Sequence, residues 1–211
     1  GPNVITTPTA PHSFTVERLA QLRAAPPPAI AALPQPRVAV VLGGKNGVYR
    51  FTEEDDERFV GALAALGGLG ASFMITPSRR THQRLIRAAD SATAAFPRIL
   101  WDMTGDNPYP DFLANADQLV VTADSVNMCG EACATGRPVW VFEPSGGSPK
   151  FRRFHEALRS HGASRPLPVR PTTMEQWSYP PLDAAGQIAA QIERRWLRRR
   201  EALPGLMASA S

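Results

Sequence analysis

The chain has 211 residues, of which 43% are hydrophobic and 20% are charged, and its formal net charge is +4. This size and hydrophobic content allow one well-packed core, and no apolar run approaches the roughly 18 residues that a membrane-spanning helix needs. We also expect no secretory leader, because residues 1–36 do not show a charged stretch, an apolar stretch and a cleavage site in succession.

The first 36 residues resemble a segment that follows another domain. Residues 1–14 have no clear hydrophobic period, and residues 24–36 are rich in Pro and Ala, as linkers are. Between them, residues 15–23 are predicted to form a short helix capped by Thr15. We interpret residues 1–36 as an arm and a Pro-rich linker that remain from a missing preceding domain, and we expect the chain to be a fragment.

The first expected strand, residues 38–42, runs directly into the glycine-rich segment 43–47. Such a loop lets the backbone approach a phosphate closely, and Lys45 adds positive charge. The spacing is neither that of a P-loop nor that of GxGxxG, so an ordinary turn remains the alternative. Thr52 then caps a helix that runs to about residue 66, and we interpret the acidic residues in its first turn as structural.

Two more strands end in polar loops. Residues 72–76 form the second expected strand, which leads to Ser78, Arg79 and Arg80 and then to a helix over residues 82–89. Guanidinium groups suit a bidentate grip on phosphate or carboxylate, although both arginines could equally be solvated surface residues. The third strand, residues 98–101, leads into the polar loop 102–109 and a short helix over residues 109–116.

Residues 119–142 give the clearest strand–helix–strand unit: an apolar run, a polar turn, a helix that stops at Gly136, and a second apolar run. The turn lies at the carboxyl end of a buried strand, where helix N-termini offer unsatisfied N–H groups to ligands. Asp124, Ser125 and Asn127 lie at this mouth, and Glu131 follows on a compatible side of the helix. The simpler interpretation is that Asp124 or Ser125 only caps the helix.

The end of the chain is basic. A loop over residues 143–148 and a helix over residues 150–161 are followed by an irregular Pro-rich segment and a final helix over residues 183–203 with an Arg-rich end. Such a helix suits an anionic membrane surface, although arginines near a helix C-terminus also complement its dipole. We expect no nucleic-acid partner, since aromatic residues are not interleaved with the basic ones. We expect a cytoplasmic location, with peripheral contact at the inner membrane left open.

Together these elements predict an α/β fold with an open, parallel, Rossmann-like sheet and helices on both faces. We divide the chain into the arm and linker (1–36), a Rossmann-like nucleotide-binding-type domain (37–180), and a basic C-terminal helix and tail (181–211). Polar loops from five strand-to-helix crossings meet at one edge of this sheet. The candidate ligand-binding residues at that edge are Gly43, Gly44, Lys45, Asn46, Ser78, Arg79, Arg80, Asp106, Asn107, Asp124, Ser125, Asn127, Met128 and Glu131. We expect no metal, since Cys129 and Cys133 have core spacing rather than ligand spacing.

Several motifs, taken in order, resemble the mitochondrial-fission "elongated mitochondria" (ELM) family. They are GGKNGVYRFTEEDDERF, MITPSRRT, WDMTGDNPY, ADQLVVTADSVNMCGEACATGRPVWVF, and KFRRFH followed by GASRPL. The resemblance covers residues 1–167, and the opening GPNVITTPTAPHSFT is similar to the middle of that family. It implies that a Rossmann-like N-terminal domain is missing here.

That family is in turn similar to the GT-B glycosyltransferases, whose C-terminal half carries the nucleotide-sugar site. By this likeness Gly43, Gly44, Ser125 and Asn127 contact the donor diphosphate, and Glu131 holds the nucleotide ribose. No metal is needed if helix N–H groups and Arg79 or Arg80 neutralise the phosphate charge. The general base of such enzymes usually comes from the N-terminal domain, so no catalytic residue is assigned.

Two functions from different classes follow from the resemblance. The first is the nucleotide-sugar-binding half of a GT-B-type glycosyltransferase, with a nucleotide sugar as substrate, no cofactor, and no activity as an isolated fragment. The second is a non-catalytic adaptor that recruits a protein partner, as plant members of the family recruit a dynamin-related protein at the outer mitochondrial membrane. Polar residues at every strand end favour a ligand site, and the Ala, Arg and Pro content is typical of bacterial proteins.

Overall fold

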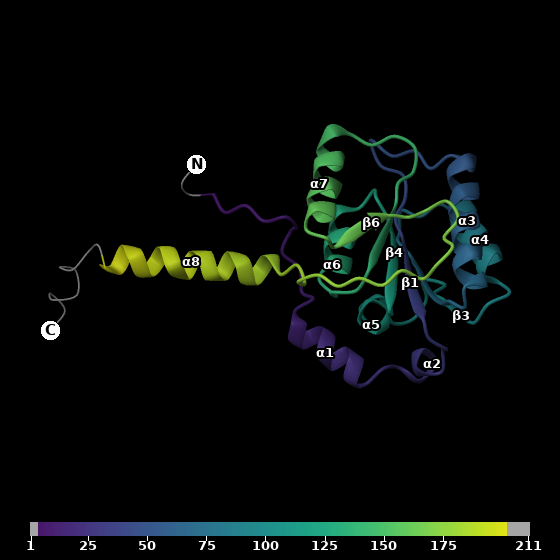
Figure 1. The fold of residues 1–211 in the computed structure, drawn as a ribbon, viewed down its shortest axis with the longest axis horizontal. Coiled ribbons are helices and arrows are strands. Elements are labelled where there is room, and N and C mark those ends of the chain that lie inside the picture. Colours follow the sequence, from purple (N-terminus) through teal and green to yellow (C-terminus); the bar gives the residue numbers. More distant parts are fainter. Residues whose placement is uncertain (1–3, 202–211) are drawn as a thin grey trace.

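A parallel sheet of six strands forms the centre of the protein, and the computed structural model describes residues 4–201 around it (Figure 1). The strands are β1 (Arg37–Leu42), β2 (Ser72–Pro77), β3 (Arg98–Leu100), β4 (Gln118–Thr122), β5 (Val139–Phe142) and β6 (Ser164–Pro166). They lie in the order β3-β2-β1-β4-β5-β6, and every pair is parallel. The order reverses between β1 and β4. In an open α/β sheet, ligands bind outside the carboxyl ends of the strands at such a point.

Helices cover both faces of the sheet. Those of the described residues are α1 (Val16–Ala24), α2 (Pro28–Ala31), α3 (Glu53–Gly68), α4 (Gln83–Thr93), α5 (Tyr109–Asn115), α6 (Val126–Cys133), α7 (Pro149–Ser160) and α8 (Ala184–Glu201). Figure 1 shows α3 and α4 together on one side of the strands and α6 and α7 on the other. The α/β fold predicted from the sequence, with its parallel sheet and its helices on both faces, is confirmed.

The central strands are continuous apolar runs because both of their faces are covered. Every residue of β2, β4 and β5 is buried, and so is every residue of β1 after Arg37. Polar groups set the helix starts between these strands. Thr52 and Asp55 form a capping box at α3, and the Ser148 side chain accepts from Phe151 N at the start of α7.

The sheet has one strand more than the sequence predicted. β6 has only three residues, and its Arg165 and Pro166 are exposed, so no apolar run marks it. It lies at the edge of the sheet beside β5, where a proline is tolerated because its missing N–H faces away from the ladder. One helix also differs from expectation, since α4 continues to Thr93 where the sequence predicted an end at residue 89.

The N-terminal segment packs on the domain, a point that the sequence left open. The helix expected over residues 15–23 is confirmed as α1, with Thr15 as its cap, and the Pro/Ala-rich stretch contains the short α2. Leu19 of α1 and Ile30 of α2 are fully buried. The Arg23 side chain donates to the carbonyl oxygens of Ala114 (2.8 Å) and Thr135 (2.9 Å). Hydrophobic and polar contacts therefore join this segment to α5 and to the end of α6.

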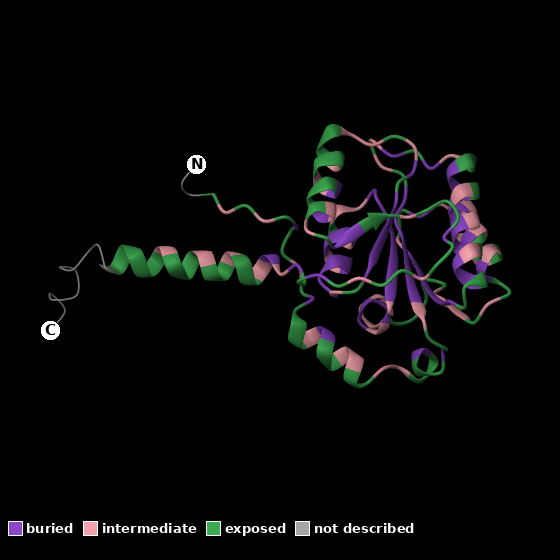
Figure 2. Cartoon of the chain, viewed as in Figure 1, coloured by how far each residue is buried: buried purple, intermediate pink, exposed green. Residues whose placement is uncertain are grey.

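The helix α8 projects away from the rest of the structure (Figure 1). Figure 2 shows it mostly exposed, in contrast to the buried strands. Its apolar side chains share this exposure, with Ile192 at 55% and Trp196 at 54%. The predicted helix extended to residue 203, and its last two residues lie outside the described part of the chain. Across residues 4–201, none of the helices combines the length and the apolar character needed to cross a membrane.

Candidate functional site

The loops after β1 and β4 meet where the strand order reverses, and we call this place the crevice. Gly43 N donates to Thr122 Oγ1 (2.8 Å), and Gly44 N donates to Asp124 Oδ2 (3.0 Å). The Thr122 hydroxyl in turn donates to Asp124 Oδ1 (2.6 Å). Two buried side chains from the end of β4 thus satisfy the first two N–H groups after β1 and fix the path of the glycine-rich loop.

Asp124 also joins this loop to the one that follows β2. Its side chain is completely buried and lies 3.1 Å from Arg80 Nη2, while Arg80 Nη1 donates to Gly44 O (3.4 Å). The Asn46 side-chain amide donates to the backbone oxygen of Asp124 (3.0 Å). We call Gly43, Gly44, Asn46, Arg80, Thr122 and Asp124 the Asp124 cluster. The predicted site residues Gly43, Gly44, Asn46, Arg80 and Asp124 are therefore brought together, and their mutual bonds hold three loops in place.

The two glycines of this cluster permit close approach between the loops. A Cβ atom at Gly43 would lie 2.1 Å from Asp124 Oδ1, and one at Gly44 would lie 1.9 Å from the backbone oxygen of Arg80. In contrast, a Cβ atom at Gly47 would meet no heavy atom within 4 Å. The packing of neighbouring loops accounts for Gly43 and Gly44 whether or not a phosphate also approaches them.

The N-terminus of α6 opens beside the Asp124 cluster. Ser125 is its cap, and the Ser125 hydroxyl accepts from Met128 N (3.4 Å), so the simple capping role is confirmed for this residue. The next residues of α6, Val126 and Asn127, lie at the positions whose N–H groups have no partner inside a helix. Asn127 is exposed, as are the predicted anion-binding residues Lys45 and Arg79. Lys45 and Arg79 thus belong to loops whose neighbouring residues, Gly44 and Arg80, contact Asp124 just before this helix start.

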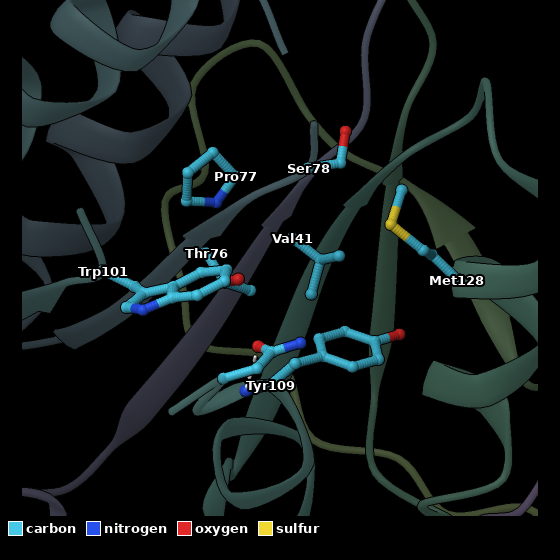
Figure 3. A pocket seen from close by; sticks show the side chains of 8 residues that line it. Val41, Thr76, Pro77, Ser78, Trp101, Tyr109 and Met128 are labelled. Carbon is cyan, nitrogen blue, oxygen red and sulfur yellow. Dashed lines mark hydrogen bonds between the residues drawn. The ribbon is translucent and has the colours of Figure 1, made fainter. Parts of the chain in front are cut away.

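A pocket of about 150 Å³ lies next to the crevice. We call it the ring pocket, and it is lined by Val41, Thr76, Pro77, Ser78, Trp101, Asn107, Tyr109 and Met128. Figure 3 shows Trp101 on one side, Met128 on the other, and Val41 between them. Three of the predicted site residues, Ser78, Asn107 and Met128, line it, whereas the predicted Asp106 is exposed in the neighbouring loop and is not part of its wall.

Hydrogen bonds hold both aromatic rings of this pocket. Trp101 Nε1 donates to Thr104 O (2.8 Å), and the Tyr109 hydroxyl donates to Glu131 Oε2 (2.6 Å). Tyr109 also packs edge-on against Phe14, with ring centroids 5.8 Å apart. Burial and then the negative charge of Glu131 raise the pKa of Tyr109, so its hydroxyl remains a donor. Glu131, the predicted ribose ligand, therefore lies at the edge of the pocket with its second oxygen, Oε1, outside this bond.

Trp101 and Tyr109 were not predicted as site residues. Trp101 follows β3 directly, and Tyr109 opens α5, so both stand at the same edge of the sheet as the predicted polar residues. An aromatic residue directly after a parallel strand is a signal that could have revealed Trp101. Phe14 gave no such signal, because it lies far from Tyr109 in the sequence and the two rings meet only in the folded chain.

A second set of contacts joins the loop after β1 to the loop after β5. Arg50 N donates to Ser145 O (3.0 Å), and Gly147 N donates to Val48 O (2.7 Å). Asp55 of the α3 capping box accepts from the backbone N (2.9 Å) and the hydroxyl (3.0 Å) of Ser145. Burial alone would raise the pKa of Asp55, but hydrogen bonds from Thr52, Arg58 and Ser145 outweigh it and lower the pKa to about 2. This carboxylate is structural, as expected for the acidic first turn.

Both cysteines and His155 are buried inside the domain. Cys129 and Cys133 are buried and unbonded to each other, and burial raises the pKa of both thiols. His155 is buried against the Ala123 carbonyl oxygen (2.9 Å), and burial lowers its pKa. In the part of the chain that the structure describes, no three His, Cys, Asp or Glu side chains are grouped so that they could hold a metal ion.

Comparisons with known proteins give a family. Residues 1–196 match the family described as "Mitochondrial fission ELM1". The mitochondrial fission protein ELM1 of Arabidopsis thaliana is 31% identical over 198 residues, which cover 93% of this chain and 46% of that protein. The uncharacterized protein RP120 of Rickettsia prowazekii (strain Madrid E) is 33% identical over 161 residues, which cover 74% of this chain and 45% of that protein. The chain thus spans about half the length of these relatives.

Solved structures are similar only at low identity. WaaG, a glycosyltransferase involved in lipopolysaccharide biosynthesis, gives a TM-score of 0.40 at 16% identity over 73% of this chain and 46% of its own. The wall teichoic acid polymerase TagF gives a TM-score of 0.37 at 15% identity over 68% of this chain and 31% of its own. Likeness at this level carries no argument about the site.

Proposed function

The chain belongs to the mitochondrial fission ELM1 family, and for this member we propose the role of the nucleotide-sugar-binding half of a GT-B-type glycosyltransferase. The observation that carries the proposal is the convergence, at the point where the strand order reverses, of a helix N-terminus, a partly exposed arginine and an aromatic pocket edged by a carboxylate. Each of these groups suits a different part of a nucleoside diphosphate.

The diphosphate would lie at the N-terminus of α6. Backbone N–H groups and the helix dipole favour an anion there. Arg80 can add a guanidinium, because its side chain remains 46% exposed while Asp124 holds one of its nitrogens. Exposed Lys45 and Arg79 add further positive charge around the opening. These groups together can neutralise a diphosphate without a metal ion.

The nucleoside would extend from the α6 N-terminus across Glu131 into the ring pocket. A carboxylate accepts hydrogen bonds only, so Glu131 suits the hydroxyl groups of a ribose. Its bond to Tyr109 fixes one oxygen and leaves the other for the ligand. We further propose that sugar transfer requires the remainder of the longer protein, where the acceptor site and general base would lie, and that this chain alone is inactive.

Replacement of Glu131 by alanine tests this arrangement. At least one of UDP, GDP, ADP, CMP or their sugar conjugates should raise the melting temperature of this chain by mass action. Glu131→Ala should weaken that binding about 10- to 100-fold, since hydrogen bonds to a charged group contribute about 1.5–3 kcal/mol. Melting curves at graded ligand concentrations measure both effects.

Tyr109→Phe is the matched control for this measurement. It keeps the ring in the pocket and removes the hydroxyl that holds Glu131, so it separates ribose binding from the positioning of Tyr109. Affinity should stay within about threefold of the parent, because the carboxylate remains. Equal losses in the two variants would show that Glu131 only positions the tyrosine. If no nucleotide raises the melting temperature of this chain or of the longer protein, the proposal is contradicted.

A second candidate is a non-catalytic adaptor for a protein partner, and α8 is the observation that favours it. The helix projects from the domain with Ile192, Trp196 and Leu197 exposed. Five of the 23 basic residues and only two of the 19 acidic residues of the chain lie in this helix. Such a surface suits either an acidic protein partner or an anionic membrane, and under this reading Glu131→Ala has no effect on function.

Vesicle binding distinguishes an anionic membrane from an acidic protein as the partner of α8. We propose that the chain binds phosphatidylserine-containing vesicles at low salt and does not bind neutral phosphatidylcholine vesicles. Arg198→Gln with Arg199→Gln should weaken binding about 30-fold, because each arginine near an anionic surface contributes about 1 kcal/mol. Arg87→Gln with Arg153→Gln, at exposed positions on α4 and α7, is the charge-matched control. Absence of co-sedimentation would leave α8 to a protein partner.

A further inference from the structure

We propose that the ring pocket selects a pyrimidine base, uracil or cytosine, and rejects purines. The proposal rests on the nucleotide-binding function above and names the class of nucleotide that the site accepts. It is carried by the volume, the rigidity and the neutral lining of the pocket.

The volume of the ring pocket suits a single six-membered ring. An engineered apolar cavity of about 150 Å³ in another protein binds benzene, and the ring pocket has the same volume. A purine adds a fused second ring, which must either displace a wall or remain in solvent. A pyrimidine can bury its whole ring and still extend its ribose through the open side.

Three of the eight residues that line the pocket are held in place against a larger base. Val41 is buried in β1, whose two neighbours β2 and β4 hold it from both sides. Trp101 and Tyr109 are held through Thr104 and Glu131. Met128 is the flexible exception, since an unbranched thioether changes shape easily. The size limit therefore depends on Met128 more than on any other lining residue.

The polar groups of the pocket suit a neutral base with a carbonyl oxygen. No charged side chain is among the eight lining residues, so a phosphate or a sugar acid would find no charged partner there. Asn107 Oδ1 accepts from Tyr109 N (3.0 Å), which leaves the amide NH₂ of Asn107 as a donor. The O2 carbonyl shared by uracil and cytosine is an acceptor for such a group. Ser78 adds a hydroxyl that can donate or accept.

The position of the pocket agrees with the order of groups in a nucleotide. Met128 both lines the pocket and belongs to the first turns of α6, and Glu131 is bonded to a tyrosine of the pocket wall. Figure 3 shows Trp101 and Met128 on opposite sides of the pocket. A base between them would have its ribose toward Glu131, which is bonded to Tyr109, and its phosphates toward the start of α6.

Calorimetric titration of this chain with UDP, CDP, ADP and GDP tests the inference. We expect the better pyrimidine nucleotide to bind at least tenfold more tightly than either purine nucleotide. Trp101→Ala should weaken pyrimidine binding about 5- to 150-fold, the range for loss of one base–aromatic stack. Trp101→Phe keeps an aromatic face and should retain affinity within about fivefold, which excludes a folding defect at this position.

A second pair of variants tests whether Met128 limits the size of the base that the ring pocket accepts. Met128→Ala removes the flexible wall, and it should reduce the preference for pyrimidines by improving the binding of ADP and GDP. Met103→Ala makes the same chemical change at an exposed position in the loop after β3 and should leave the preference unchanged.

The outcomes separate this inference from the function on which it rests. Equal binding of purines, or a pyrimidine preference that survives Trp101→Ala, would overturn the base assignment and leave nucleotide binding in place. If none of the four nucleotides binds to this chain or to the longer protein, the proposed function itself fails.

Discussion

Replacement of Gly44 by alanine is expected to lower the free energy of unfolding by about 1–3 kcal/mol, the usual range for an overpacked site. The new Cβ would lie 1.9 Å from the backbone oxygen of Arg80, and backbone cannot rotate away as a side chain can. The loop after β1 must therefore move away from the loop after β2. That movement should break the hydrogen bond from Gly44 N to Asp124 and open the crevice, so nucleotide binding should be lost together with stability.

Gly47→Ala is the matched control, because it makes the same change in the same loop. A Cβ atom at Gly47 meets no heavy atom within 4 Å, and its φ is outside the left-handed region. We expect an unfolding free energy within about 0.5 kcal/mol of the parent, or a gain of up to about 1 kcal/mol from a stiffer unfolded chain. Urea titrations followed by circular dichroism measure both variants. Equal stability of Gly44→Ala and Gly47→Ala would contradict the close approach of the two loops.

Asp124→Ala should cost about 3 kcal/mol of unfolding free energy. The buried carboxylate accepts from Gly44 N, from the Thr122 hydroxyl and from Arg80, and its loss leaves the first two donors buried without a partner. Arg80 can turn to solvent, so the cost stays below that of an abandoned buried charge. Asp124→Asn should cost less, about 2 kcal/mol, since an amide keeps the shape but must point an NH₂ group at one of these donors.

Asp106→Ala is the control for this carboxylate. Asp106 is exposed in the loop after β3, and no hydrogen bond of its side chain is found among residues 4–201, so the change should stay within about 0.5 kcal/mol. Urea midpoints with unchanged slopes would show that stability alone has changed. If Asp124→Ala is as stable as the parent, the carboxylate does not hold the loops together, and its burial would need another explanation.

Most of the fold could be predicted because buried parallel strands are short apolar runs that stop at polar or glycine residues. The stretch that contains β4, α6 and β5 shows this, since its strands, cap and glycine stop all appear in the sequence as they do in the structure. β6 lacked this signal, because an edge strand of three residues needs only backbone pairing with β5. The expected ELM family is confirmed by the match over residues 1–196.

The sequence predicted where the candidate site lies, at the carboxyl ends of the strands, but not which of its side chains contact one another. Chain order shows that Asp124 follows β4 and Arg80 follows β2, but it does not show that their side chains meet each other at 3.1 Å. The sequence suggested ligand contacts for both, and that role stays a prediction alongside the structural one described here. Trp101 and Tyr109 belong to different loops, so their pocket exists only in the folded chain.

The bonds that fix the loops around the crevice also bear on how a ligand would bind. Tyr49 and Gly146 form an isolated antiparallel bridge, and Gly147 N donates to Val48 O, so backbone bonds tie the loop after β1 to the loop after β5. Little chain entropy would be lost on complex formation, and a modest number of contacts could give useful affinity. Lys45, Arg79 and Arg80 would attract an anionic ligand, so association should slow as rising ionic strength screens these charges.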